Sequence, residues 1–259
     1  MLKLNGIPED RARDYTEFTR DLLQQVLSEP ASKDERGQQS FHERAGRLSL
    51  TLGLLLYALE ADAEEVRRLF RNAARHLVPA LSLRQRPDPG IHWSPWEAEQ
   101  FINVIVCFGE AADMKVIALL KPWQYRNPVH PEHDGLERYL AILLRYAGGA
   151  GVDADALAKV AKACETPSTT KDNHLFLLPA TRGLASLAGE DEDNWNYAIV
   201  QLLSAHGREA RRGDLKFLPD GFISFRALML AKVGMDQDME CRADSEYLPL
   251  FLFEGREPA

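Results

Sequence analysis

The residues best suited to chemistry lie in one short run, His130-Pro131-Glu132-His133-Asp134, which holds two imidazoles and two carboxylates. These side chain types can bind zinc. The run contains a proline, and it has no cysteine pair and no second cluster of such residues near it in the sequence. The pattern therefore favours a solvated loop that leads into the next helix, and we expect neither a metal nor a cofactor.

The familiar catalytic motifs are absent from the rest of the sequence. It contains no nucleophile elbow, no phosphate-binding P-loop, no dinucleotide fingerprint and no HExxH zinc motif. The run Gly148-Gly149-Ala150-Gly151 lies between two predicted helices and no predicted strand precedes it, so it indicates a helix end and a turn. The sequence thus predicts a protein that is not an enzyme. A metal site at His130 and His133 is the enzymatic alternative.

Acidic residues near the C-terminus are the main candidates for a binding surface. They are Asp236, Asp238, Glu240, Asp244 and Glu246. A second acidic group, at 190–193, precedes a predicted helix, where carboxylates interact favourably with the positive end of the helix dipole. The C-terminal group follows a predicted helix and has no such structural role. We therefore interpret it as a surface for a protein partner.

Two tryptophans are further candidates for contact with a partner. Trp93 and Trp123 both lie in predicted loops. Tryptophan is enriched among the residues that dominate binding energy, and it also covers helix ends as a half-buried residue. We expect core packing for tryptophan in general, with contact to a partner as the alternative, and Trp93 and Trp123 are the likelier contact residues because both lie in loops.

Charge limits the class of partner. The chain has 31 lysines and arginines against 39 aspartates and glutamates, a net charge of −8. Binding to nucleic acid or to an anionic membrane needs an excess of positive charge, so this composition suits a basic protein partner instead. Arg67, Arg71 and Arg75 share one face of a predicted helix. We expect this face to be solvated and paired with acids, with a phosphate-binding patch as the alternative.

Apolar periodicity predicts about ten helices to carry these residues. Tyr15, Phe18, Leu22 and Val26 predict an apolar stripe on the first helix, and short alternation at 239–241 predicts one small strand. Ser40 and Glu43 predict a capping box at the start of the second helix. The expected helices are 10–28, one that starts at Ser40, one capped by Asp62, 94–108, 111–120, 136–147, 153–164, 173–187, 192–211 and 222–233.

These elements predict an all-α fold, an irregular array of about ten helices in antiparallel hairpins with little or no strand. We expect a single α-helical domain over 1–259, whose softest point of division is the loop 122–134. Three widely spaced cysteines predict no disulfide framework. The N-terminal segment lacks the apolar core of a secretion signal, and the apolar run 48–59 is too short to span a membrane. We therefore expect a cytoplasmic protein.

The C-terminal quarter carries a family resemblance. The apolar segment 222–233 is followed by Gly234, a charged stretch and the closing motif Tyr247-Leu248-Pro249. This arrangement resembles the C-terminal signature of the Imm49 family, helical immunity proteins of bacterial toxin–antitoxin conflict systems. The resemblance implies a non-enzymatic protein that binds a cognate polymorphic toxin, often a nuclease or a nucleic-acid deaminase, and blocks it. It implies no particular set of toxin-binding residues.

Together these features predict an immunity protein that neutralises a basic protein toxin by covering its active site, with no direct binding of nucleic acid or membrane. The predicted toxin-binding residues are Asp236, Asp238, Glu240, Asp244, Glu246, Trp93 and Trp123. The alternative is a non-enzymatic helical adaptor in a regulatory or secretion complex.

Overall fold

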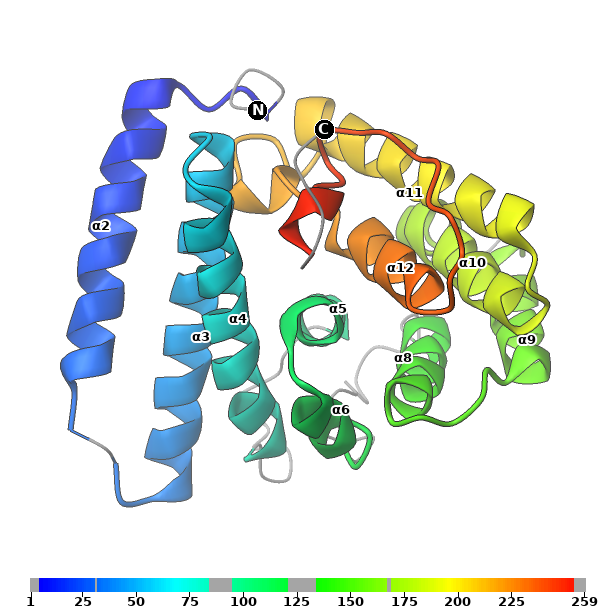
Figure 1. Ribbon diagram of the computed structural model, residues 1–259, viewed down its shortest axis with the longest axis horizontal. Helices are drawn as coiled ribbons and strands as arrows, with labels where there is room; N and C mark the ends of the chain where they lie inside the picture. The colour runs from blue at the N-terminus through cyan, green and yellow to red at the C-terminus, as the bar shows by residue number, and fades with distance from the viewer. Residues whose placement is uncertain (1–4, 31, 84–94, 121–133, 167–168, 254–259) are drawn as a thin grey trace.

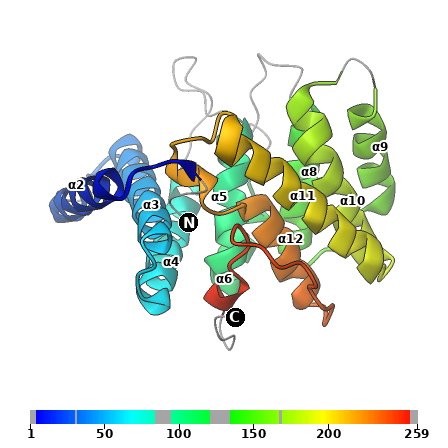
Figure 2. The same cartoon turned by 90° about the horizontal axis from the view of Figure 1, so that it is seen from above.

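The computed structural model describes residues 5–30, 32–83, 95–120, 134–166 and 169–253. These residues form ten α-helices and no strand, which confirms the all-α prediction (Figures 1 and 2). The helices are α2 (Glu9–Ser28), α3 (Glu35–Ala58), α4 (Ala63–Ser82), α5 (Pro95–Phe108), α6 (Ala111–Ile117), α8 (Asp134–Ala147), α9 (Ala154–Cys164), α10 (Leu178–Ala188), α11 (Glu192–Arg212) and α12 (Phe225–Met235). Three short turns of helix accompany them: η2 (Asn173–Leu177), η3 (Pro219–Gly221) and η4 (Leu250–Leu252). None of the described helices is long and apolar enough to cross a membrane.

Helices α2, α3 and α4 lie side by side at one end of the molecule (Figure 1). Helix α4 begins as predicted, because the Asp62 carboxylate accepts hydrogen bonds from the backbone N–H groups of Glu64 and Glu65. The predicted capping box at Ser40 is wrong. Helix α3 begins five residues earlier, where the carboxylate of Asp34 accepts a hydrogen bond from Gly37. Aspartate is as good a helix cap as serine, and no proline separates the two positions.

The predicted apolar stripe of α2 is also wrong in part. Tyr15 and Phe18 are 44% and 58% exposed, whereas Ala12, Thr16 and Thr19 are buried. The hydroxyl of Thr16 donates to the Ala12 carbonyl at 2.7 Å, and Thr19 makes the same bond one turn on. Because their hydroxyls are satisfied within the helix, small threonines can pack against α3. The larger aromatic residues are left on the outer face.

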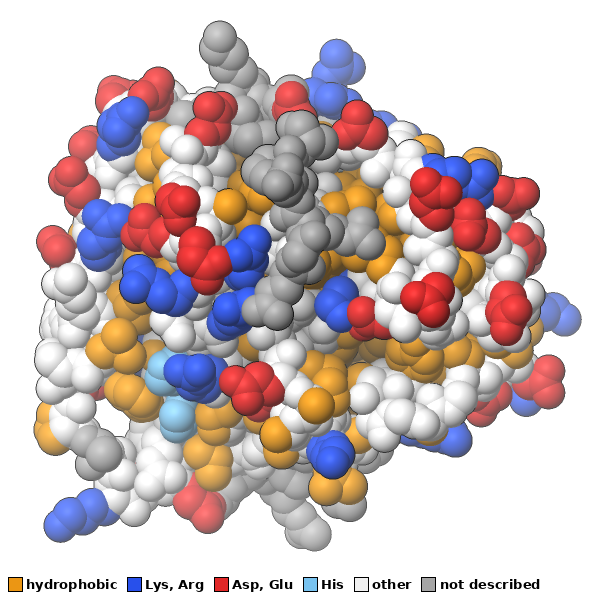
Figure 3. Space-filling view, in the orientation of Figure 1, with side chains coloured by type: hydrophobic (Ala, Val, Ile, Leu, Met, Phe, Trp, Pro, Cys, Tyr) orange, Lys and Arg blue, Asp and Glu red, His pale blue; other side chains and the backbone are white. Residues whose placement is uncertain are grey.

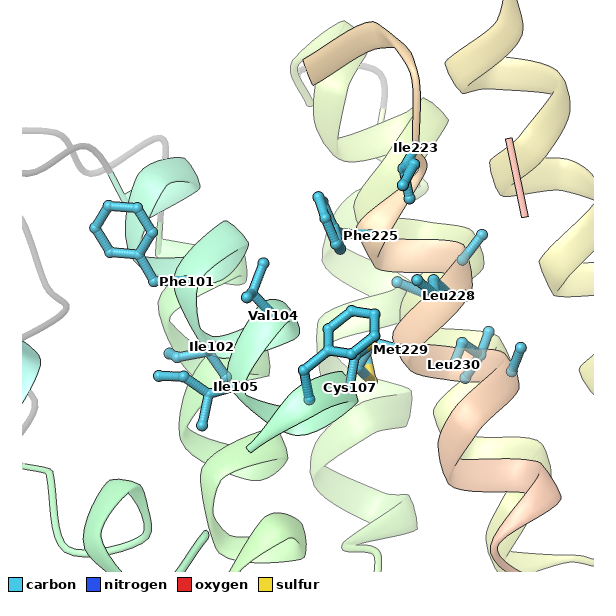
Figure 4. Packing of buried hydrophobic residues seen from close by; sticks show 14 of the residues in the cluster. Phe101, Ile102, Val104, Ile105, Cys107, Ile223, Phe225, Leu228, Met229 and Leu230 are labelled. Atoms are coloured by element: carbon cyan, nitrogen blue, oxygen red, sulfur yellow. The ribbon is translucent and has the colours of Figure 1, made fainter. Parts of the chain in front are cut away.

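Helix α5 occupies the middle of the molecule and packs against α4, α8 and α12 (Figures 1 and 2). Its apolar residues are buried on several sides of the helix, including Phe101, Ile102, Val104 and Ile105. Such all-round burial is typical of a central helix. Figure 4 shows Val104 and Cys107 on the side of α5 that faces α12, and Phe101, Ile102 and Ile105 on its other side.

Helices α8 to α12 form the other end of the molecule (Figure 1). Trp195 of α11 is fully buried, and its indole N–H donates to the Leu230 carbonyl of α12 at 3.0 Å. Gly234 lies against the same indole: a Cβ at this position would come within 2.2 Å of the ring. Helix α12 continues through Gly234 to Met235. The glycine is therefore required for close packing rather than as a helix stop.

The C-terminal segment returns to the core beside α3 and α4. Leu248, Leu252 and Phe253 are buried, and the Arg67 guanidinium donates to the carbonyls of Leu252 and Phe251 at 2.9 and 3.1 Å. Apolar residues from before and after the loop 122–134 belong to one continuous cluster. The loop itself lies outside the described residues, and the single-domain organisation stays a prediction.

Candidate functional site

The predicted acidic residues lie on the segment that connects α12 to the C-terminal turn η4. This segment turns sharply after Met235, with Asp238 in a left-handed conformation at φ 62°, and then runs along α11 (Figure 1). It rejoins the core at Tyr247, whose carbonyl accepts a hydrogen bond from the backbone N–H of Ser224 at 3.0 Å. The segment is thus fastened at both ends.

One side chain of α11 holds the middle of the segment. The Asn196 amide donates to the Glu240 carbonyl at 3.0 Å, and its oxygen accepts a hydrogen bond from the Arg242 backbone N–H at 2.8 Å. An asparagine therefore supplies the bonds that a neighbouring strand would supply. The small strand predicted at 239–241 is wrong, because the described residues place no second strand beside it.

Burial alternates along the segment although it is not a strand. Met239, Cys241 and Ala243 are half-buried and pack on the core, while the residues between them are exposed. All five predicted acids are exposed: Asp236, Asp238, Glu240, Asp244 and Glu246. The segment therefore turns its acids outward and its small apolar residues toward the core.

The pairing of these acids differs along the segment. Asp236 accepts hydrogen bonds from Lys232, at 2.6 Å to one carboxylate oxygen. The other four form no salt bridge with any residue that the structure describes. Four carboxylates are thus available to a partner without displacing an internal ion pair.

The structure adds two acids that the sequence analysis assigned only to a helix start. Asp193 is exposed and Glu192 is half-buried on the first turn of α11, and Arg242 lies 3.5 Å from the Glu192 carboxylate and 2.5 Å from that of Asp193. The hydrogen bond that the Arg242 guanidinium donates to Asp193 raises the pKa of Arg242 above its ordinary value. We call these two residues and the five acids of the segment the acidic surface. Figure 3 shows acidic side chains gathered over the α11 and α12 end of this face.

The predicted role of the neighbouring Asp191 is confirmed. Its carboxylate accepts a hydrogen bond from the Asn194 backbone N–H at 3.1 Å and caps α11. The hydrogen bonds from Asn194 lower the pKa of Asp191. This carboxylate is therefore engaged in the fold, unlike those of Asp238, Glu240, Asp244 and Glu246.

The remaining predicted site residues, Trp93 and Trp123, lie outside the described residues, as do His130 and His133. In the ranges that the structure does describe, no group of three histidines, cysteines, aspartates or glutamates is arranged to hold a metal ion.

The arginines of α4 line an open hollow of about 820 Å³ beside α12. Arg67 pairs with Glu64, and Arg71 lies 3.9 Å from the same carboxylate. Glu110, Asp113 and Asp236 also line the hollow. Cations and acids are thus interleaved here, as expected for a solvated face that pairs with acids.

Comparison with known proteins gives one finding. The family model described as Immunity protein 49 matches residues 50–252, which is more than half of the chain. No curated protein and no solved structure matches the chain. The match includes α4 to α12 and the whole acidic surface, while α2 and the first part of α3 lie before it.

Proposed function

This chain belongs to the Immunity protein 49 family, and we propose that it binds a cognate toxin in the cytoplasm and blocks it without chemistry of its own. Family membership is the observation that supports the immunity role. The exposed carboxylates of the acidic surface support a basic toxin as the partner. A nuclease or a nucleic-acid deaminase is such a toxin, because a protein that holds nucleic acid carries excess positive charge.

The proposed mechanism is coverage of the toxin's active site. A standard interface buries about 800 Å² on each partner, and no catalytic group is needed on the inhibitor. Unpaired carboxylates at the rim of an interface accelerate encounter with an oppositely charged partner and disfavour wrong partners. Asp238, Glu240, Asp244 and Glu246 have this character, because they are exposed and form no ion pair among the described residues.

A charge-matched pair of variants tests the role of the acidic surface. In one variant, Asp236, Asp238, Glu240, Asp244 and Glu246 are changed to the corresponding amides. In the control, the exposed acids Glu9, Asp10, Asp14, Glu17 and Asp21 of α2 are changed in the same way. Association with the toxin encoded beside this gene is measured at low and high salt. We expect only the first variant to associate more slowly and to lose most of the salt dependence.

Equal slowing in both variants would show that net charge alone steers the toxin. A double variant, His130→Ala with His133→Ala, tests whether inhibition needs binding alone. It should protect cells against the co-expressed toxin as well as the wild type does. Loss of protection, with toxin binding retained, would support a metal-dependent activity instead.

A further inference from the structure

A second polar site lies between α5, α11 and the start of α12, apart from the acidic surface. It is a cavity of about 260 Å³. Glu99 of α5 is 1% exposed and accepts two hydrogen bonds from the Arg226 guanidinium of α12, the one from Nε at 2.5 Å. Trp96 and Phe176 pack on this guanidinium, with ring centres 5.2 and 4.9 Å away. The one buried cation of the cavity is therefore already paired.

The cavity is also lined by a half-buried carboxylate with no such partner. Asp220, in the turn η3, accepts a hydrogen bond from the Gln100 side chain at 2.8 Å and forms no salt bridge with the described residues. Burial raises the pKa of Asp220, and the charge of nearby Arg47 offsets this only in part. Arg47 itself is paired with Glu43 and Glu97. A carboxylate in this position is stabilised by any cation that enters the cavity.

Asn103 supplies a second unsatisfied acceptor. It lines the cavity and is 2% exposed, and its side-chain oxygen has no hydrogen-bond partner within the described part of the chain. Buried polar atoms nearly always have a partner, because an unpaired one loses its bonds to water without replacement. The missing partner of Asn103 Oδ1 is a donor, since this atom can only accept.

The entrance of the cavity is acidic as well. Asp172 and Asp214 are exposed there, and Glu209 is held by Lys171 at 2.8 Å. Besides these two ion pairs, the lining includes the carboxylates of Asp172, Asp214 and Asp220, which form no salt bridge with the described residues. The cavity therefore disfavours an anion, and an apolar group would leave its buried acceptors unsatisfied.

We propose that this cavity receives one cationic side chain, an arginine or a lysine, from the surface of the toxin. The inference rests on the proposed immunity function and adds a specific contact to it. A cavity of this size holds a single long side chain but no folded segment. An arginine is favoured over a lysine, because the guanidinium presents several N–H donors in a plane and can bond to Asp220 and Asn103 at once. A buried arginine at the centre of an interface is typical of the residues that dominate affinity.

Two substitutions in the cavity wall test the proposal. Asp220→Asn removes the unpaired charge, and Asn103→Leu removes the unpaired acceptor at similar size. Each should weaken toxin binding about 10- to 100-fold, the worth of a hydrogen bond to a charged group. Asp21→Asn on α2 makes the same change of charge outside the cavity and should leave the dissociation constant unchanged. Asp220→Asn should melt no lower than wild type, because it removes a half-buried carboxylate without a cation.

A small probe tests the cavity without the toxin. N-acetylarginine amide should shift the amide resonances of residues that line the cavity, whereas uncharged N-acetylglutamine amide should not. Asp220→Asn should abolish the shifts. Spermidine is titrated in parallel to detect a free polyamine as the natural occupant.

The possible results separate this inference from the immunity proposal. Wild-type protein that protects cells, together with Asp220→Asn and Asn103→Leu variants that bind toxin normally, overturns the cavity inference alone. Wild-type protein that neither binds nor protects overturns the immunity proposal, and the arginine probe then decides whether the cavity takes a cation. Tight spermidine binding, with toxin affinity unchanged in both variants, assigns the cavity to a free polyamine and overturns the inference.

Discussion

At the residue scale, His206 illustrates how burial links one side chain to the stability of the protein. Its Nε2 lies 3.1 Å from the Gly221 carbonyl, and its ring meets Tyr247 edge-on at 5.1 Å. Burial lowers the pKa of His206 to about 4. In the unfolded chain, His206 is therefore protonated as the pH falls through about 6.5, whereas in the folded protein it is protonated only near pH 4.

This difference predicts a loss of stability in mild acid. Because the folded pKa is depressed, the free energy of unfolding should fall by about 3 kcal/mol as the pH falls from about 6.5 to about 4. Below pH 4, His206 contributes no further change. Urea unfolding across this range should show a shallower pH dependence for His206→Gln than for the wild type.

The control is His174→Gln, which changes an exposed histidine and should keep the wild-type pH dependence. The Nδ1 atoms of His42 and His76 lie 3.0 Å apart, and burial lowers the pKa of both side chains. They add a pH dependence to the free energy of unfolding that is the same in the wild type and in both variants. An unchanged slope in His206→Gln would show that its ring is not the source of the effect.

At the element scale, the contact between α11 and α12 depends on Gly234. Helix propensity alone favours Gly234→Ala by about 1 kcal/mol. The added Cβ would meet the Trp195 indole at 2.2 Å, and overpacking of a buried contact costs about 1–3 kcal/mol. We therefore expect Gly234→Ala to lower the melting temperature. Gly151→Ala, where no atom lies within 4 Å of the new Cβ, should melt like the wild type.

The C-terminal segment is a second element whose docking can be tested. Deletion of the residues after Asp244 removes the buried side chains of Tyr247, Leu248, Leu252 and Phe253, each worth roughly 1.5–3 kcal/mol when buried. The truncated protein should melt at lower temperature or become insoluble. Leu252→Ala, which removes one fully buried side chain, should remain soluble and lose about 2–5 kcal/mol. Wild-type melting of both proteins would contradict docking of the segment.

Sequence patterns predicted those elements whose signals are local. Asp62, Asp153 and Asp191 each cap a helix within a residue or two of the predicted start, because a cap acts on its own first turn. The buried face of α2 was predicted in part wrongly. Which residues of a helix are buried depends on the helices beside it. The spacing of Tyr15 and Phe18 within α2 does not indicate which face of the helix packs against α3.

In the candidate site, too, the features with local signals were predicted and those that depend on the path of the chain were not. The exposure of the five segment acids agrees with their prediction as a surface, which was made because they follow a helix and have no role at a helix start. Their approach to Glu192 and Asp193 was not predicted, since it depends on the path of the segment along α11. The cavity was missed altogether, because Asn103, Asp220 and Arg226 come from three separate elements.

At the scale of the whole molecule, the two proposed binding features should affect different steps of association. Four carboxylates of the acidic surface are exposed and form no ion pair with the described residues, so their charges act on the toxin over a distance before contact. The cavity acts only after contact, because Asn103 is buried and Asp220 is half-buried among the residues that line it. Rim charges mainly set association rates, whereas a buried charged contact mainly sets the dissociation rate.

This separation predicts distinct kinetic effects for two variants on one protein. The five-amide variant of the segment should associate about tenfold more slowly at low salt, with little change in its dissociation rate. Asp220→Asn should dissociate about 10- to 100-fold faster, with an unchanged association rate. The two changes share no side chain, so their effects on the free energy of binding should add in the combined variant. Surface plasmon resonance at low and high salt measures both rates. A faster dissociation of the five-amide variant that persists at high salt would place the acids inside the interface rather than at its rim.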